Sequence, residues 1–390
     1  MSTSWQTSLP DCGFHVTSTL VSGSKVYAAC NGYVYLLDIG TGNVLYQNGL
    51  SGRGNKEVRL AISDNGWTLI VGIDGYVLGL NSSNLDTWWE KSLPKCGYNL
   101  VNVFAAGGGG VGYAACNGYV YSYNVSDGEI QKMNSLSGRG EHETRLSLTF
   151  AADVLLVGIN GYALGLDSSS LSTDWQTSLP DCGYAITSVT GGEGCCYAAC
   201  NGYLYKIDAS TGEVTDQNGM DGTGKAECRL CLRQDGGALF VGLNGYAFAA
   251  KSSDISTIYR TSLPDCGFNI TDVISGVFYT YFGCNGYVYS LDDYGHVVTV
   301  NALPGLGKHE TRLAIDTKAQ GDVFIGINGY CVAVESVPPT PAGPWMANSA
   351  ANIGPRMLRQ ITIPGSHDSG SYAIIPLSPI GQDLPCPMIS

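Results

Sequence analysis

The sequence repeats one three-residue signal, Asn-Gly-Tyr or Asp-Gly-Tyr, eight times. The copies begin at Asn31, Asp74, Asn117, Asn160, Asn201, Asn244, Asn285 and Asn328, so successive copies lie 41 or 43 residues apart. A fixed period of this size is typical of repeat architectures. An Asn-Gly or Asp-Gly pair between two apolar runs also predicts a β-hairpin, because a type I′ turn needs positive φ at both central residues. The spacing therefore predicts an all-β fold, an eight-bladed β-propeller with one hairpin signal in each blade.

The eight units alternate between two kinds, so the repeating unit is a pair of blades. Three odd units carry Tyr-Ala-Ala-Cys before the signal, as at Tyr27–Cys30, and the fourth ends in Phe282-Gly283-Cys284. Even units carry Val-Gly-Ile, as at Val71–Ile73, with close variants at Val241 and Ile325. Each pair also repeats two connecting segments. One is Ser-Leu-Pro-Asp-Cys-Gly followed by an aromatic residue, as at Ser8–Phe14, and the other ends in Glu-x-Arg-Leu. The sequence thus predicts four tandem blade pairs over residues 1–336.

The two ends of the repeat array predict how the ring closes. Even units end in an outer-strand sequence such as Ser172–Pro180, but the last unit runs into the proline-rich residues 337–344 instead. Proline cannot donate to a sheet ladder. The missing sequence stands at the start of the chain, as Ser2–Pro10. We therefore expect residues 2–9 to form the outer strand of the last blade, which removes two exposed sheet edges.

Charge and hydropathy exclude several classes of partner. The net charge of −13 and the pI near 4.7 argue against nucleic acid and anionic membrane surfaces, because both require a basic footprint. The sequence contains no apolar run as long as a membrane span, so direct membrane insertion is not expected. The N-terminus has neither a basic start nor an apolar stretch, so we expect a cytoplasmic protein, unless it is exported without a signal.

Two segments resemble a known blade motif. Leu37–Tyr46 and Ile207–Val214 resemble the blades of the quinoprotein (PQQ-like) eight-bladed propellers, whose motif runs Asp-x-x-Thr-Gly and ends in Trp. The resemblance covers residues 1 to about 336 and supports the architecture. Proteins that share a fold often differ in their chemistry, so the resemblance does not imply a quinone, and we expect no cofactor. The adjacent cysteines Cys195 and Cys196 resemble the vicinal pair of some quinoprotein dehydrogenases, but they occur in one copy only, and a quinone-dependent oxidoreductase is the least favoured function.

A pair of cysteines recurs once in each blade pair. The pairs are Cys12 and Cys30, Cys96 and Cys116, Cys182 and Cys200, and Cys266 and Cys284. Cys228 and Cys231 have metal-ligand spacing once, without a histidine nearby, so no metal site is expected. A disulfide within each pair is one alternative. Alignment of the blades places Cys30 where Ile73 stands, and this core position together with the missing signal peptide favours buried free cysteines.

The Glu-x-Arg motif has two interpretations. Side chains two apart on a strand share a face, so Glu57 and Arg59 can meet each other or form a repeated ion pair between blades. Alternatively, the motif, the glycine-rich loops and the hairpin tyrosines gather at one end of the propeller around four similar grooves. Planar polar groups beside aromatic faces hold sugar rings, and four weak sites give avidity. The candidate ligand-binding residues are Arg53, Glu57, Arg59, Arg139, Glu143, Arg145, Glu227, Arg229, Glu310, Arg312, Tyr33, Tyr119, Tyr203 and Tyr287. Sites that use Arg53 and Arg139 should weaken in the later pairs, where Thr223 and Leu306 replace them.

The end of the chain resembles a different family. Leu358–Tyr372, with Pro-Gly-Ser-His-Asp-Ser at its centre, resembles the opening of the catalytic X domain of phosphatidylinositol-specific phospholipase C. The resemblance implies that His367 is a general base for the inositol 2-hydroxyl and that Asp368 supports it. Only 46 residues run from Trp345 to Ser390, with a single histidine, whereas a (β/α)8 barrel needs about 200 residues or more. Residues 337–390 are therefore expected to be a proline-rich linker and a truncated fragment, with His367 and Asp368 vestigial and no phosphodiesterase activity.

These observations favour a non-enzymatic, multivalent, lectin-like propeller. We expect glycans or glycoconjugates as ligands, with a protein partner on the propeller face as the alternative. The motif near the C-terminus suggests a second function. The propeller would then be the binding or targeting domain of a phospholipase C-like phosphodiesterase whose catalytic barrel is missing here.

Overall fold

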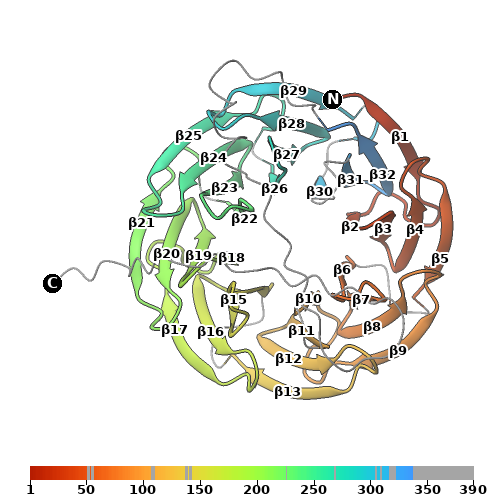
Figure 1. Cartoon of the computed structure of the whole chain (residues 1–390), viewed down its shortest axis with the longest axis horizontal. Helices are drawn as coiled ribbons and strands as arrows, with labels where there is room; N and C mark the ends of the chain where they lie inside the picture. The colour runs from red at the N-terminus through yellow and green to blue at the C-terminus, as the bar shows by residue number, and fades with distance from the viewer. Residues whose placement is uncertain are drawn as a thin grey trace, which may run out of the picture. The chain divides into compact units, whose positions relative to one another are not determined.

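A computed structural model describes residues 1–50, 53, 57–106, 110–136, 139, 143–224, 226–267, 269–303, 305–307, 310–315 and 322–336. These residues form eight four-stranded antiparallel sheets arranged as the blades of a propeller (Figure 1). Each blade runs from an inner strand near the axis to an outer strand at the rim. The predicted all-β, eight-bladed fold is confirmed. Residues 337–390, with His367 and Asp368, lie outside the described residues.

The odd blades, numbered along the chain, each use four consecutive strands. They are β2(Ser18–Ser22), β3(Lys25–Cys30), β4(Tyr33–Asp38) and β5(Val44–Gly49); β10(Asn102–Ala105), β11(Val111–Cys116), β12(Tyr119–Asn124) and β13(Ile130–Ser135); β18(Ser188–Gly191), β19(Cys195–Cys200), β20(Tyr203–Asp208) and β21(Val214–Gly219); β26(Asp272–Ser275), β27(Thr280–Cys284), β28(Tyr287–Leu291) and β29(Val297–Ala302).

The even blades follow the same order until the last one. They are β6(Arg59–Ile62), β7(Thr68–Ile73), β8(Tyr76–Asn81) and β9(Thr87–Ser92); β14(Arg145–Leu148), β15(Val154–Ile159), β16(Tyr162–Asp167) and β17(Thr173–Ser178); β22(Arg229–Leu232), β23(Ala238–Leu243), β24(Tyr246–Lys251) and β25(Thr257–Ser262); β30(Arg312–Ile315), β31(Val323–Ile327) and β32(Tyr330–Val334), completed by β1(Thr3–Ser8).

The first strand of the chain closes the ring, as expected. β1 pairs antiparallel with β32, from Thr3 opposite Val334 to Ser8 opposite Tyr330. Trp5 is buried between blades 8 and 1, and its indole nitrogen donates to the carbonyl of Ile39 at 2.9 Å. Closure therefore combines a sheet ladder with an aromatic side chain that anchors the N-terminus to the next blade.

The repeated Asn-Gly pairs form the turns between the second and third strands. In the first of them, Asn31 has φ of 52° and Gly32 has φ of 80°, as a type I′ turn requires. A second glycine, Gly42 in the turn of the Asp-x-x-Thr-Gly motif, has φ of 71°, and a Cβ there would come within 2.4 Å of the Trp5 ring. Glycine at this position thus lets the outer-strand tryptophan of the preceding blade lie flat against the turn.

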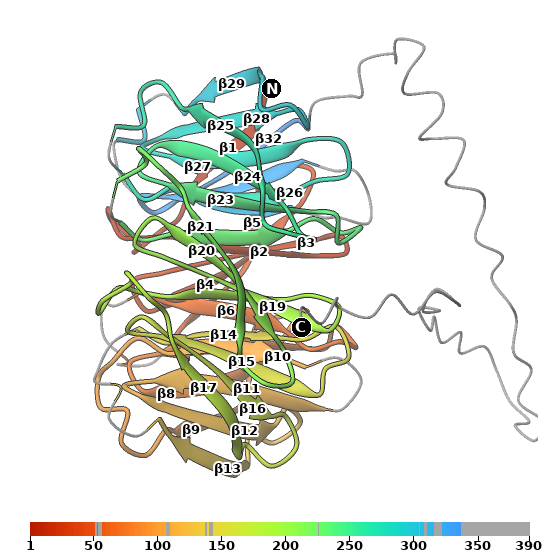
Figure 2. The same cartoon turned by 90° about the vertical axis from the view of Figure 1, so that its left-hand side faces the viewer.

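The core lies between neighbouring blades. Each hydrophobic cluster joins side chains of adjacent sheets, such as Phe324 of β31 with Val26 and Tyr35 of blade 1. Figure 2 shows the propeller from the side, with its sheets stacked around the ring. Among the described residues, no helix is long and apolar enough to cross a membrane.

The cysteine pairs correct one expectation. Cys12–Cys30, Cys96–Cys116, Cys182–Cys200 and Cys266–Cys284 are disulfides, with Cα atoms 5.4–5.6 Å apart, within the usual range for such bonds. Buried free cysteines at these positions were therefore the wrong interpretation. The alignment had correctly placed Cys30 in the core, but it could not show that the loop carrying Cys12 folds back onto the Cys30 hairpin.

Candidate functional site

The four Glu-x-Arg motifs meet near the propeller axis in one closed ring of ion pairs. Each arginine begins the inner strand of an even blade and contacts both the glutamate two residues before it and a glutamate of another even blade. Arg59 reaches Glu143, Arg145 reaches Glu227, Arg229 reaches Glu310, and Arg312 reaches Glu57. All eight contacts are 2.5–3.0 Å long. We call these eight residues the axial ring. The predicted pairing between blades is confirmed.

The electrostatics of the axial ring are uneven. Burial alone would raise the pKa of Glu143, but Arg145, Arg59 and Arg229 together lower it below its ordinary value. At the other side, burial raises the pKa of Glu310 to about 7, although Arg229 opposes the shift.

Asp272 adds a fifth carboxyl beside Arg229. It is half-buried at the start of β26, where it accepts a hydrogen bond from the Leu313 amide at 2.9 Å, and desolvation of its carboxyl raises its pKa. Blades 1 and 5 have Ser18 and Ser188 at this position, donating to backbone carbonyls at 2.6 and 2.5 Å.

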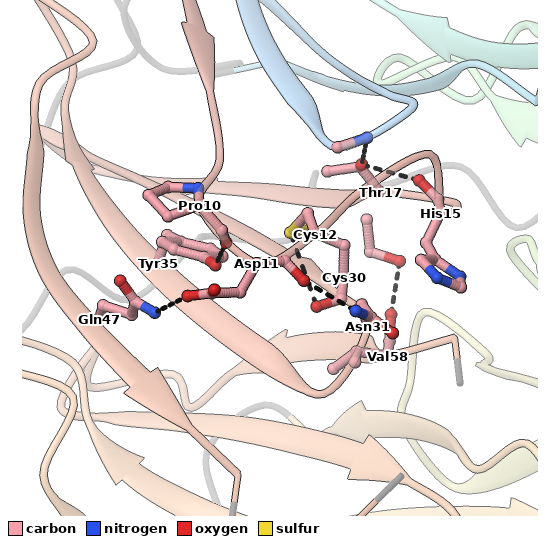
Figure 3. Close-up of a disulfide and its surroundings, with 12 residues drawn as sticks. Pro10, Asp11, Cys12, His15, Thr17, Cys30, Asn31, Tyr35, Gln47 and Val58 are labelled. Carbon is pink, nitrogen blue, oxygen red and sulfur yellow. Dashed lines mark hydrogen bonds between the residues drawn. A yellow bond between two sulfur atoms is a disulfide. The ribbon is translucent and has the colours of Figure 1, made fainter. Parts of the chain in front are cut away.

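The loops that enter the odd blades are held at three points. Figure 3 shows the first of them: Cys12 is bonded to Cys30, Asn31 donates to the Asp11 carbonyl at 2.7 Å, and the Tyr35 hydroxyl donates to the Pro10 carbonyl. Equivalent contacts recur in the other three odd blades. We call residues 9–17, 93–101, 179–187 and 263–271 the anchored loops.

Each anchored loop also joins two blades. In the first, the Leu9 amide donates to the Gly329 carbonyl at 2.8 Å, and the Thr17 hydroxyl accepts from the Gly329 amide at 2.9 Å. The loop is therefore fastened to the hairpin of the blade before it as well as to its own, and its backbone is fixed before any ligand arrives.

An exposed aromatic residue stands on each anchored loop that is fully described. Phe14, Tyr98 and Tyr184 are 82%, 76% and 85% exposed. The fourth equivalent, Phe268, lies outside the described residues. Large aromatic side chains presented on rigid backbone are typical of binding surfaces. These aromatic residues were not among the predicted ligand-binding residues, although their recurrence directly after Cys-Gly was a signal in the sequence.

The predicted tyrosines lie beside the anchored loops rather than at the axial ring. Tyr33 stacks against Tyr35 with ring centroids 6.3 Å apart, and Tyr119, Tyr203 and Tyr287 repeat the arrangement at 6.2–6.4 Å. They are half-buried at the start of each third strand. The structure therefore does not bring the tyrosines of the odd hairpins into contact with the Glu-x-Arg residues.

Arg53 and Arg139 occupy a third location, the loops that enter even blades 2 and 4. The Arg53 guanidinium lies 3.9 Å from the centre of the Tyr76 ring, and that of Arg139 lies 4.0 Å from the centre of Tyr162. Arg53 also forms an ion pair with Glu90 on β9. These tyrosines come from the even hairpins and were not among the predicted residues.

Of the described cysteines that form no disulfide, Cys195, Cys196, Cys228 and Cys331 are buried and Cys231 is half-buried. The Cys195 thiol donates to the Tyr197 hydroxyl at 3.2 Å at the start of β19. Burial raises the pKa of Cys228 and Cys331 to about 12, which keeps these thiols protonated and unreactive at neutral pH. In the described part of the chain, no three His, Cys, Asp or Glu residues are grouped closely enough to hold a metal ion.

Comparison with known proteins shows the fold. No protein-family model and no curated protein matches this sequence. Many solved structures are similar to this chain, among them three that are similar over most of its length. BamB from Moraxella catarrhalis is 14% identical, with a TM-score of 0.64, over 86% of this chain and 99% of its own. The computationally designed Ika8 protein is 18% identical, with a TM-score of 0.65, over 85% and 98%.

Sqt1 from Saccharomyces cerevisiae is the third, 14% identical with a TM-score of 0.70 over 87% of this chain and 100% of its own. At these identities the similarity supports the eight-bladed propeller and nothing finer. The quinoprotein resemblance of the blades and the phospholipase resemblance of the tail stay predictions.

Proposed function

We propose that the chain is a non-enzymatic binding protein that holds carbohydrate ligands at several equivalent positions on the face formed by the hairpins and anchored loops. The observation that carries the proposal is the repeated, highly exposed aromatic residue on a loop fastened by a disulfide, at Phe14, Tyr98 and Tyr184. An aromatic face packs against the apolar face of a sugar ring, and a loop already fixed loses little conformational entropy on binding.

Polar groups suited to sugar hydroxyls stand near two of these aromatics. Gln47 donates to the Asp11 carboxylate at 3.2 Å, and Gln217 donates to Asp181 at the same distance. In each case the aspartate lies three residues before the exposed aromatic. Carboxylate and amide groups of this kind orient a ligand that the aromatic face holds.

Repetition around one ring would raise the apparent affinity. A single exposed aromatic site is expected to bind weakly, but a ligand that reaches two or more sites can gain about 10²–10⁴ in avidity when its length matches their spacing. We therefore expect branched or polymeric glycans to bind more tightly than their monosaccharides.

A glycan array with matched variants tests the proposal. The variant F14A/Y98A/Y184A should lose binding at least tenfold, since each truncation removes the packing surface of one site, with roughly 1 kcal/mol or more at each. The control W67A/F150A/Y294A removes three aromatics that are 61–77% exposed at the turns of the opposite face and should bind as wild type. Equal binding by both variants would contradict the site, and silence of wild type across all glycans would favour a protein partner.

The disulfides also bear on where the protein works. Four bonds of this kind persist in oxidising compartments and are rare in the cytosol. We propose an oxidising compartment in place of the cytoplasm expected from the N-terminus. Blocking thiols in material from the native source before mass analysis should leave these eight cysteines unlabelled, and full labelling would support the cytoplasm instead.

A second candidate function rests on the tail motif alone. If a longer form of the chain carries a complete barrel, the propeller would serve as the binding or targeting domain of a phosphatidylinositol-specific phosphodiesterase. For the chain of 390 residues we predict no turnover of phosphatidylinositol. Activity that disappears in His367→Ala would contradict that prediction.

A further inference from the structure

The loops entering the even blades differ from one another at one three-residue site. The site consists of three residues: one from the loop, the tyrosine of the hairpin, and one from the outer strand. The outer strand pairs with the third strand of the blade, which begins at that tyrosine. In blade 2 the three residues are Arg53, Tyr76 and Glu90. The register of the outer strand pairs Leu78 with Glu90 in blade 2, Leu164 with Gln176 in blade 4 and Phe248 with Arg260 in blade 6. The three outer-strand residues are therefore structurally equivalent, and their charges are negative, neutral and positive.

In blade 2 the arginine of this site forms an ion pair with a carboxylate of the chain itself. The Arg53 guanidinium lies over Tyr76, 3.9 Å from the ring centre, and its edge meets the Glu90 carboxylate. The two charged side chains are only 24% and 32% exposed. Stacking fixes the plane of a guanidinium, and its edge then presents parallel N–H donors that match an oxyanion. The chain's own carboxylate occupies the place that a ligand's carboxylate would take.

Blade 4 has the same arginine without that carboxylate. Arg139 lies over Tyr162, 4.0 Å from the ring centre, and Asn160 donates to its carbonyl, which holds the loop in place. Gln176 replaces the glutamate. Among the residues that the structure describes, Arg139 forms no ion pair. A half-buried, stacked guanidinium that lacks an anion attracts one strongly, because charge-assisted hydrogen bonds are stronger than neutral ones.

Blades 6 and 8 do not repeat the arrangement. Thr223 is buried at the arginine position of blade 6, and Arg260, from the outer strand, donates to the Asp221 carbonyl. Leu306 is buried at the corresponding position of blade 8. The stacked arginine without a carboxylate partner is thus particular to blade 4 within the described part of the ring.

We propose that Arg139 and Tyr162 form a binding site for an oxyanion, and that the ligand is an acidic saccharide whose carboxylate or sulfate takes the position that Glu90 has in blade 2. This inference rests on the proposed carbohydrate function and names the ligand class. The site gives the propeller one position specific for acidic sugars among several that recognise sugar rings by aromatic contact.

Exchanges between blades 2 and 4 test the site. Probes are a glycan ending in glucuronate, its glucose-ending counterpart and inorganic sulfate, measured by calorimetry at 0.15 M salt, because the net charge of −13 repels anions at lower salt. R139Q should weaken glucuronate and sulfate binding at least about tenfold, the loss expected for a charge-assisted hydrogen bond. Q176E should do the same by supplying an internal carboxylate. R53Q is the matched control and should leave both probes unaffected.

A gain of binding completes the test. E90Q removes the carboxylate from Arg53, so the number of anion sites should rise from one to two. Wild-type affinity in both R139Q and Q176E, or E90Q without a second site, would overturn the proposal. Its failure is distinct from that of the carbohydrate function. If no glycan binds but sulfate binding depends on Arg139, the oxyanion site stands without its saccharide; if the glucose-ending glycan binds and R139Q changes nothing, only the oxyanion site fails.

Discussion

The two kinds of blade hold the propeller together in different ways. In the odd blades, a disulfide such as Cys182–Cys200 joins each anchored loop to the hairpin of its own blade. Two hydrogen bonds accompany this disulfide. The even blades are linked by charge, since Arg229 and its equivalents form the axial ring. The disulfide and its two accompanying hydrogen bonds recur in all four odd blades, whereas the residues at the Arg53 and Glu90 positions of the even blades differ from one blade to the next. The even blades therefore present chemically different side chains at structurally equivalent positions of the same propeller.

Deletion of residues 1–9 should have the largest effect, because it removes β1, on which closure of the whole ring depends. The deletion exposes the edge of β32 and removes buried Trp5, whose loss alone is expected to cost about 3–5 kcal/mol. Together with the lost ladder this approaches the total stability of a typical domain. We expect no cooperative thermal transition by circular dichroism. A synthetic peptide of residues 1–12 added in excess should restore the transition, and a deletion that melts within a few degrees of wild type would exclude closure by β1.

Arg229→Ala should be the most damaging single change in the even blades. It leaves Glu227, Glu310 and Asp272 without their common cation in a buried site, and breaking such a pair from one side costs about 3–5 kcal/mol. Chemical denaturation measures the loss. The control is Arg233→Ala, directly after the other end of β22, where the ion pairs to Asp235 and Asp293 are exposed and are expected to contribute at most about 1 kcal/mol. Similar losses in both variants would mean that the axial ring contributes no more than a surface pair.

Replacing one disulfide should cost somewhat less. The bond between Cys182 and Cys200 closes a segment of 18 residues, for which the chain-entropy estimate is about 3 kcal/mol. We expect C182A/C200A to lose that amount in denaturant, and C12A/C30A, in the odd blade four positions away, to add to it independently. Cys228→Ala, which removes a buried thiol without a disulfide, should cost about 1 kcal/mol. A loss in C182A/C200A no larger than in this control would show that the pair is reduced in the folded protein.

The same contrast explains how far the sequence could predict the molecule. The eight hairpins follow from Asn-Gly chemistry, which is local, and closure by β1 follows from a repeated outer-strand sequence that one end lacks. The disulfides were one alternative but were not favoured, because Cys12 reaches Cys30 only after the loop folds back across the hairpin. The partner of Arg59 was left open for a similar reason: Glu57 is near in sequence, whereas Glu143 is brought close only by the closed ring. Exposure of Phe14 likewise depends on the path of a loop and not on residue type.

The stability of the axial ring should also depend on pH, through the two carboxyl groups whose pKa values are raised. Burial raises the pKa of Glu310 to about 7 and raises that of Asp272, so both bind protons more tightly in the folded state than in the unfolded state. Stability from these groups is complete below their unfolded pKa values and falls as the pH rises through 7. For Glu310 the fall amounts to about 3 kcal/mol at most. Glu143, whose pKa is lowered, acts in the opposite direction but only at more acidic pH, so it does not cancel the trend.

Asp272→Asn isolates one of the two groups. Asparagine keeps an oxygen that can accept from the Leu313 amide, and Asn102 stands at the equivalent position of blade 3. Removing the fifth carboxyl should stabilise the protein at pH 8 by on the order of 1 kcal/mol and should leave its stability at pH 5 nearly unchanged. Denaturant titrations at pH 5, 6, 7 and 8 give the slope for wild type and variant. Equal slopes would mean that Asp272 remains ionised throughout this range, with Arg229 compensating fully for its burial, and that the even side of the ring tolerates five carboxylates as well as four.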